Sequence, residues 1–300
     1  MKFTGERLIP KINDGCAFFY EHILRYFFAC QYTKNKIVLD AGCGAGYGSY
    51  LISKYGQSKL VEAIDISKET IKYAKSQYSE PNINFHTDNI LVLKTIKDKT
   101  IDVVTNFEVI EHIKEQDIFL KQIKRVLKND GVLIISTPNI LNHPKGNKYH
   151  LKELKPNNFN ILLKKYFKKV SILSQNFYLT QEINSINNPS TINLKTKNSF
   201  FEQNIVNLKE PKNIKNSEYL VAICSDKETI IPKPISLSLE KVDNFDLSKG
   251  IRSLYFQFNK IKKLNNKLKL ELIELKEIKD SKFYKLWPIY CRFKKIFIKK

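Results

Sequence analysis

Cysteine is scarce in this chain, with five residues in 300 and no C-x-x-C pair among them. That scatter argues against a disulfide framework and against a zinc site built from cysteine. No apolar run is long enough to span a bilayer, and the first residues lack the apolar core of a signal peptide. We therefore expect a cytoplasmic protein with one α/β domain and an appendage.

Acidic residues are outnumbered, 30 against 51 basic ones, which gives a net charge of +21. The excess is uneven: residues 251–300 hold 15 basic and 4 acidic residues, whereas residues 1–150 hold 21 and 16. The body of the chain is therefore only mildly basic. A nucleic acid substrate is not favoured.

Glycine is scarce as well, with ten residues, yet four of them fall at alternate positions within residues 42–48. The apolar residues 37–39 and Asp40 precede them, which predicts a buried strand that runs into a turn and then a helix. The spacing does not fit G-x-G-x-x-G, because the last position falls on Tyr47 or Ser49. A phosphate-binding P-loop does not fit either, since no Gly-Lys-Ser/Thr ends the turn.

Further strands recur along the chain, each separated by a helical or loop segment. They are predicted at residues 60–66, 83–86, 101–107 and 132–136, with a turn at 129–131 before the last. This βαβ spacing predicts a parallel sheet with helices on both faces, and ligands of such sheets lie at the carboxyl ends of the strands. Acids gather at those ends: Asp40, Asp65, Asp88 and Glu108. The four placements agree with one cofactor site.

Two of these acids also have a plainer interpretation. Asp65 precedes Ser67, a predicted helix N-cap, and an acid there favours the helix N-terminus whether or not it binds a ligand. Asp88 could equally be a loop aspartate that caps the next segment.

The pattern Asp-x-Gly-x-Gly-x-Gly at residues 40–46 resembles motif I of class I S-adenosylmethionine (SAM)-dependent methyltransferases. Further stretches within residues 1–225 resemble bacterial small-molecule and glycan methyltransferases and, in part, 3-demethylubiquinol O-methyltransferases: residues 4–7, Glu21-His22 with Arg25-Tyr26, residues 108–112, 136–139 and 147–151. The resemblance implies an α/β, Rossmann-like, seven-stranded methyltransferase sheet within residues 1–230. Its last two strands are predicted at 167–173 and 218–224.

The same resemblance implies SAM as the cofactor. Its binding residues are expected at the glycine turn and the strand ends: Asp40, Gly42, Gly44, Gly46, Asp65, Ile66, Asp88, Asn89, Phe107 and Glu108. Asp65 is placed to accept hydrogen bonds from both ribose hydroxyls, since a carboxylate accepts two. The family places an acid or amide, here Asp88, near the adenine amino group. An acid ahead of the turn also suits a cationic cofactor better than a pyrophosphate.

Methyl transfer to a hydroxyl requires alignment of the acceptor and removal of a proton. His112 and His150 are the candidate bases, because imidazole titrates near neutral pH and both lie on loops expected at the cofactor end of the sheet. A structural or capping histidine is the alternative for each. Glu108, Glu111 and His112 match positions thought to hold magnesium in the ubiquinone-related enzymes. Two carboxylates and one imidazole are a sparse set for magnesium, so we assign no metal ligand and keep magnesium as an alternative cofactor.

The remainder of the chain is organised differently. An Asn-rich insertion at 175–216 is predicted to shape the acceptor site or to be a surface loop. A linker is predicted at 231–249. Apolar residues spaced by three and four over 250–280 then predict a coiled coil, in which Asn265 favours a parallel homodimer. The alternative is a single amphipathic helix that packs on the body of the protein. The tail at 281–300 mixes basic and aromatic residues, which suits peripheral contact with the inner membrane face or a solvated tail.

We therefore expect a SAM-dependent O-methyltransferase that acts on a small-molecule or glycan acceptor, specifically a sugar or glycan intermediate of surface polysaccharide biosynthesis. A quinone-type acceptor is the second hypothesis, since it shares the Glu-x-x-Glu-His loop at 108–112. A non-catalytic scaffold that uses the coiled coil to organise partners is the third.

Overall fold

The computed structural model describes residues 8–10, 17–142, 147, 149–176, 214–229 and 231. The chain divides into two units at residues 239 and 240, and every described residue lies in the first. The coiled coil at 250–280, the tail at 281–300 and all of the linker after Ile231 therefore lie outside the described residues. The homodimer and the membrane contact that depend on them stay predictions. Of the insertion, the structure describes residues 175–176 and 214–216.

Strands and helices alternate along most of the described chain. The order is α2 (Ala17–Cys30), β1 (Ile37–Ala41), α3 (Tyr47–Lys54), β2 (Leu60–Asp65), α4 (Lys68–Gln77), β3 (Ile83–Thr87), β4 (Ile101–Phe107), the 3-10 turn η1 (Ile110–His112), α5 (Gln116–Val126), β5 (Leu127–Pro138), α6 (Pro156–Lys164), β6 (Lys169–Gln175), the 3-10 turn η3 (Ile214–Asn216) and β7 (Tyr219–Ser225).

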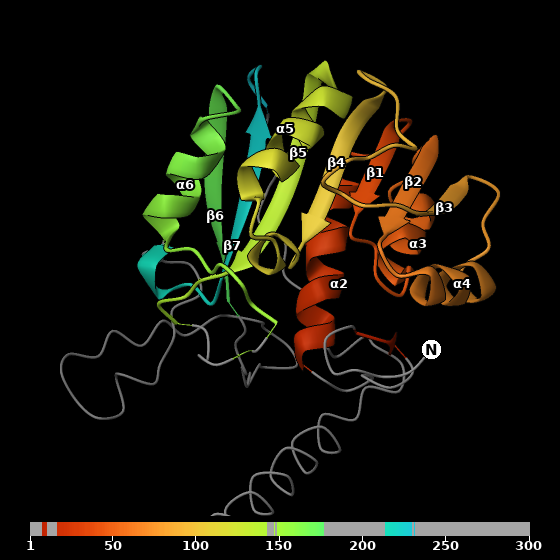
Figure 1. Cartoon of the computed structure of the whole chain (residues 1–300), viewed down its shortest axis with the longest axis horizontal. Helices are drawn as coiled ribbons and strands as arrows, with labels where there is room; N and C mark the ends of the chain where they lie inside the picture. Colours follow the sequence, from red (N-terminus) through yellow and green to blue (C-terminus); the bar gives the residue numbers. More distant parts are fainter. Residues whose placement is uncertain are drawn as a thin grey trace, which may run out of the picture. The chain divides into compact units, whose positions relative to one another are not determined.

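The strands form one seven-stranded sheet in the order β3-β2-β1-β4-β5-β7-β6, which Figure 1 shows edge to edge. Strands β1 to β5 pair in parallel, whereas β7 runs antiparallel to both β5 and β6. The predicted Rossmann-like, seven-stranded sheet is confirmed. No helix among the described residues has both the length and the apolar character needed to cross a bilayer.

Several predicted strand boundaries differ from the structure. Strands β6 and β7 begin at Lys169 and Tyr219, later than predicted, and Phe167 is buried in the core ahead of β6. The turn predicted at 129–131 lies within β5, so this prediction was wrong. Leu127 pairs with Ile101 and the next paired residue is Val132, so the residues between bulge out of the ladder instead of ending the strand.

Side chains alternate between the two faces of the sheet along each strand, and both faces carry buried side chains. Helices therefore cover both faces. On one face, Leu39 and Ala41 of β1 belong to the main apolar cluster together with buried side chains of α5 and α6. Asp40 points to the opposite face, where its carboxylate accepts hydrogen bonds from Tyr26 of α2 and Ser49 of α3. Strand β1 is therefore buried on both sides, and its carboxyl end opens at the edge where the glycine turn begins.

Candidate cofactor and acceptor site

The glycine turn joins β1 to α3, and its three glycines have the positive φ angles that favour glycine: +90° at Gly42, +52° at Gly44 and +89° at Gly46. A Cβ atom at Gly42 would lie 2.6 Å from the Cγ2 atom of Val109. At Gly44 it would meet no heavy atom within 4 Å. The turn is therefore closed against the loop after β4 and open at Gly44, where a ligand can approach the backbone.

Asp40 lies beneath this turn and is only 1% exposed. Its carboxylate accepts hydrogen bonds from the hydroxyls of Ser49 at 2.7 Å, Thr105 at 2.9 Å and Tyr26 at 3.3 Å. Burial raises the pKa of Asp40 from 3.8 to about 6, although the three hydroxyls partly oppose that shift. Asp40 thus connects α2, α3 and β4 under the predicted cofactor site.

Asp65, at the end of β2, supports the turn from the other side. One carboxylate oxygen accepts a hydrogen bond from the backbone of Gly44 at 3.2 Å, and the other accepts one from Ser67 at 2.8 Å. The bond from Ser67 shows that Asp65 favours the N-terminus of α4, as its plainer interpretation predicts. The bond from Gly44 places the same carboxylate beside the open part of the turn. The next side chain, Ile66, is 66% exposed and offers an apolar surface there.

Asp88, after β3, shows the capping role. Its carboxylate accepts hydrogen bonds from the backbone of Asn89 at 2.7 Å and from the backbone and hydroxyl of Thr95 at 2.8 and 2.9 Å. These bonds fold the loop that joins β3 to β4. Asp88 and Asn89 still lie at the carboxyl edge of the sheet, since the backbone of Asp88 donates to the carbonyl of Asp65.

Arg125, near the end of α5, holds the rest of that loop. Its guanidinium donates hydrogen bonds to the carbonyls of Val92 at 3.2 Å, Leu93 at 2.9 Å and Ile96 at 3.2 Å. Leu93 is fully buried and has a φ of +48°. One side chain therefore binds three carbonyls of the loop, a role that no sequence pattern indicates.

Glu108 follows β4 with a φ of +55°, an uncommon backbone angle for this residue type. Its Oε1 atom accepts hydrogen bonds from Ser136 at 2.6 Å and from Arg25 at 3.3 Å. Arg25 is almost fully buried, also contacts Gln175, and lies 4.6 Å from the centre of the Tyr219 ring. Sequence reasoning did not place Arg25 in the site. A single arginine within the apolar and aromatic helix α2 is the signal that could have found it.

Phe107, the last residue of β4, is buried at 4% exposure. Its ring packs edge-on against Tyr26, with the ring centres 5.0 Å apart. Phe107, one of the residues predicted to bind the cofactor, therefore lies in the core beside Tyr26, the tyrosine that donates a hydrogen bond to Asp40.

The two predicted histidines are brought together. The rings of His112 in η1 and His150, before α6, have centres 5.0 Å apart and meet edge to face. The Nδ1 atom of His112 lies 2.9 Å from the carbonyl of Tyr149, and that of His150 lies 2.6 Å from the carboxylate of Glu153. A carbonyl and a carboxylate both accept, so each Nδ1 donates and each Nε2 carries the lone pair.

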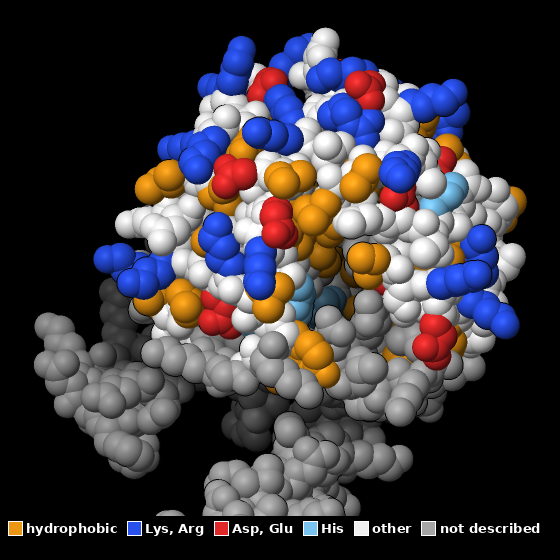
Figure 2. Space-filling view, viewed as in Figure 1, with side chains coloured by type: hydrophobic (Ala, Val, Ile, Leu, Met, Phe, Trp, Pro, Cys, Tyr) orange, Lys and Arg blue, Asp and Glu red, His pale blue; other side chains and the backbone are white. Residues whose placement is uncertain are grey.

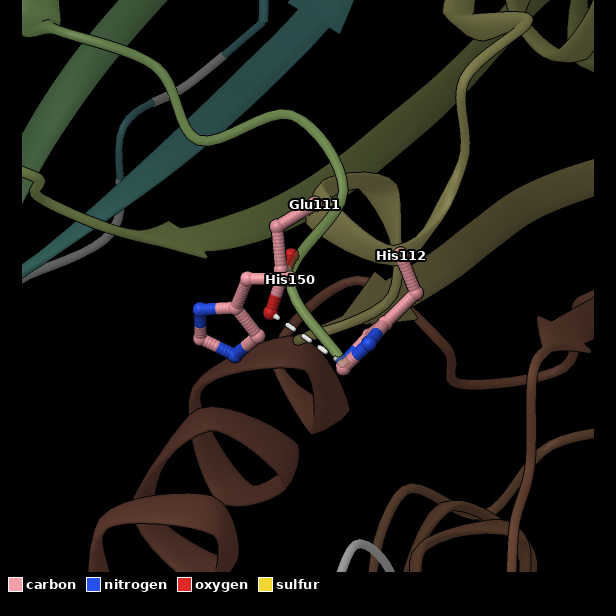
Figure 3. A group of neighbouring side chains, drawn as sticks. All are labelled: Glu111, His112 and His150. Carbon is pink, nitrogen blue, oxygen red and sulfur yellow. Dashed lines mark ion pairs between the residues drawn. The ribbon is translucent and has the colours of Figure 1, made fainter. Parts of the chain in front are cut away.

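Glu111 lies between these rings, as Figure 3 shows, and its side chain is 1% exposed. Its Oε2 atom accepts a hydrogen bond from Thr137 at 3.3 Å, and its backbone carbonyl accepts from Leu151 and Lys152. The two backbone bonds attach the His150 segment to η1. Burial, reinforced by the charge of Glu108, raises the pKa of Glu111 well above its usual range.

The candidate site thus has two parts at one edge of the sheet. The glycine turn, Asp65 and the loop after Asp88 form the first, and Glu111 with the two histidines forms the second. Figure 2 shows histidine side chains in a hollow of this face, bordered by hydrophobic side chains. Apolar surface also comes from Leu151, which is 53% exposed and directly follows His150.

The sequence matches a family described as methyltransferase domain over residues 32–184. It is 33% identical over 168 residues to a Mycobacterium tuberculosis protein named as a probable S-adenosylmethionine-dependent methyltransferase. The match covers 54% of this chain and 60% of that protein. The chain thus spans about 60% of the length of the first curated relatives it matches. It is also 35% identical over 108 residues to a ubiquinone biosynthesis O-methyltransferase of Pelagibacter ubique, covering 35% of this chain and 43% of that protein.

Among solved structures, the fold is similar to a chain in a complex that contains the Haloferax volcanii Trm112 methyltransferase activator. The TM-score is 0.50, with 13% identity, and the match covers 72% of this chain and 94% of that chain. At this identity the likeness concerns the fold alone.

Proposed function

This chain belongs to the SAM-dependent methyltransferase family, and from that premise we propose that it transfers a methyl group from SAM to a hydroxyl of a sugar or glycan intermediate. The observation that carries the proposal is the open glycine turn with the Asp65 carboxylate beside Gly44, at the same sheet edge as the paired histidines. In open α/β sheets, ligands bind at this edge.

The residues of the first part fit the chemistry of SAM. The open position at Gly44 admits a ligand against the backbone, and the Asp65 carboxylate next to it suits ribose hydroxyls. The exposed side chain of Ile66 provides an apolar surface for a flat base. The nearby acid Asp40, beneath the turn, suits a cationic cofactor, whereas the charge of Glu108 is already paired with Arg25. When bound, SAM supplies an electrophilic methyl group on a sulfonium.

The residues of the second part fit an oxygen acceptor. Methyl transfer from a sulfonium is an in-line displacement, so the acceptor oxygen has to be aligned with the methyl group and lose its proton. The rings of His112 and His150 meet with their centres 5.0 Å apart, and Tyr149 and Glu153 hold their Nδ1 protons, so that Nε2 carries the lone pair of each. The Nε2 atom of His150 accepts a hydrogen bond from the Asn147 amide, which an acceptor hydroxyl would replace. We infer that the acceptor hydroxyl lies against these two imidazoles.

A quinone-type acceptor is the second candidate. The likeness to the ubiquinone biosynthesis O-methyltransferase, 35% over 108 residues, favours it, as does the exposed apolar side chain of Leu151, which directly follows His150. A non-catalytic scaffold that binds SAM through the same turn is the third.

A screen for release of the demethylated cofactor distinguishes these candidates. Purified full-length protein is incubated with SAM and, separately, with nucleotide sugars, glycolipids and quinone precursors. Turnover on the sugar-containing acceptors supports our first choice, and turnover only on quinone precursors supports the second. SAM binding without turnover on any of these acceptors supports the third candidate, the non-catalytic scaffold. Asp65→Ala should abolish turnover, while Asp130→Ala, which removes an exposed acid near the opposite end of β5, should not.

A further inference from the structure

One member of the magnesium set implied by the resemblance is already engaged by other residues of this structure. Glu108 belongs to that set, but its Oε1 atom is engaged by Ser136 at 2.6 Å and by the buried guanidinium of Arg25 at 3.3 Å. A cation on this oxygen would displace these contacts and lie close to another positive charge. Glu108 is therefore a poor partner for Glu111 and His112 in holding an ion.

A different set does converge. Glu111, His112 and His150 each offer one ligand atom, and the three atoms lie within 4.8 Å of one another. The Glu111 Oε1 atom is 3.8 Å from the Nε2 atom of His112. Figure 3 shows the carboxylate between the two imidazoles, which come from different segments of the chain. Ligand atoms about 2.1 Å from a shared tetrahedral ion lie about 3.5 Å apart, so small side-chain rotations bring the three to an ion.

The surroundings of the three ligands support such a site. Each imidazole donates its Nδ1 proton to an oxygen, from Tyr149 for His112 and from Glu153 for His150. This is how ligating histidines in proteins are held, because the Nδ1 contact fixes the tautomer that puts the lone pair on Nε2. The Nε2 atom of His150 accepts a hydrogen bond from the Asn147 amide at 2.9 Å, and a bound ion would take the place of this donor. The Glu111 Oε1 atom is buried and has no hydrogen-bond partner within the described part of the chain. An unpaired buried carboxylate oxygen is costly unless a cation completes it.

We propose that Glu111, His112 and His150 bind a divalent transition metal ion of the zinc class, in place of the magnesium implied by the resemblance. Two imidazoles and one carboxylate suit zinc and its neighbours, whereas magnesium prefers oxygen ligands alone. Three protein ligands also leave one position of a tetrahedral ion open. On the assumption that the proposed function is right, this open position faces the acceptor hydroxyl, and the two histidines act on it as ligands and not as free bases.

Direct metal binding tests the site without reference to activity. Full-length protein is stripped with chelator and titrated with Co²⁺, whose visible absorption reports ligand number and geometry, then with Zn²⁺ and Mg²⁺ by calorimetry. The expected result is one Co²⁺ or Zn²⁺ per chain and no binding of Mg²⁺. His150→Gln and Glu111→Gln should each weaken Co²⁺ binding at least tenfold. Retained SAM binding by either variant shows that it is folded.

His86→Gln is the matched control, because His86 also pairs with a carboxylate, that of Glu62 at 2.6 Å, but is outside the converging set. It should bind Co²⁺ like the wild type. Three results would overturn the proposal: no stoichiometric Co²⁺ or Zn²⁺ in the wild type, equal affinity in His150→Gln, or Mg²⁺ binding that is lost in Glu108→Gln. A failure of the proposed function is seen separately, as absence of SAM binding by the same samples or of turnover in the acceptor screen. Full methyl transfer by the stripped protein would contradict the role at the acceptor.

Discussion

Arg25 of α2 and Glu108 at the end of β4 form a nearly buried ion pair of 3.3 Å, although they are 83 residues apart in the sequence. The arginine side chain is 1% exposed, so its charge depends on this partner. Removing one member of a buried pair typically costs about 3–5 kcal/mol, because the other charge stays buried without compensation.

We therefore expect Glu108→Gln and Arg25→Met each to lower the free energy of unfolding by about 3 kcal/mol or more. The double variant should lose much less than the sum, since it leaves no unpaired charge. Urea unfolding of the four proteins measures this coupling. A double variant whose loss equals the sum would show that the two side chains do not depend on each other.

The glycine turn allows a matched pair of substitutions. Gly44→Ala adds a methyl group into open space at a φ of +52°, which costs about 1–2 kcal/mol of stability, but it fills the position where the cofactor is expected. Gly42→Ala adds more backbone strain, because the φ of +90° lies outside the left-handed α region, and also a contact of 2.6 Å with Val109. Gly44→Ala should therefore fold and lose SAM affinity at least tenfold, while Gly42→Ala should show the larger drop in melting temperature. Unchanged SAM affinity in Gly44→Ala would place the cofactor elsewhere.

Asp40 should make stability depend on pH. Its pKa is about 6 in the folded protein against an ordinary value of 3.8, so between these values the folded state binds more protons than the unfolded state. Stability due to this group is present below about pH 4 and is lost as the pH rises through 6, by about 3 kcal/mol in all, at 1.4 kcal/mol per pKa unit. Urea unfolding at pH 4 and 7 measures it. Asp40→Asn should lack this contribution, and Asp130→Asn should keep it.

Arg125 should act on cofactor binding from a distance. Arg125→Lys removes the fork that binds the carbonyls of Val92, Leu93 and Ile96, so the loop after Asp88 should loosen. We expect faster amide hydrogen exchange in residues 88–99 and a KM for SAM raised about tenfold, with kcat little changed. Lys121→Gln, an exposed change on the same helix, is the control. A fall in kcat with an unchanged KM would contradict this positioning role.

The sheet and its carboxyl edge could be predicted because both follow from local patterns: apolar strands, alternating helices and acids at strand ends. The contacts within the site could not. The rings of His112 and His150 meet because Leu151 and Lys152 donate backbone hydrogen bonds to the Glu111 carbonyl, and nothing in a sequence pattern indicates such bonds. The ion pair of Arg25 likewise depends on tertiary packing of α2.

The central claim is that this sheet edge binds SAM, and calorimetric titration of SAM into the full-length protein tests it most directly. We expect one site per chain, unchanged affinity in Asp130→Ala and affinity at least tenfold lower in Asp65→Ala, whose carboxylate lies 3.2 Å from the backbone nitrogen of Gly44. Absence of binding by the wild type, or equal binding by Asp65→Ala, would contradict the account.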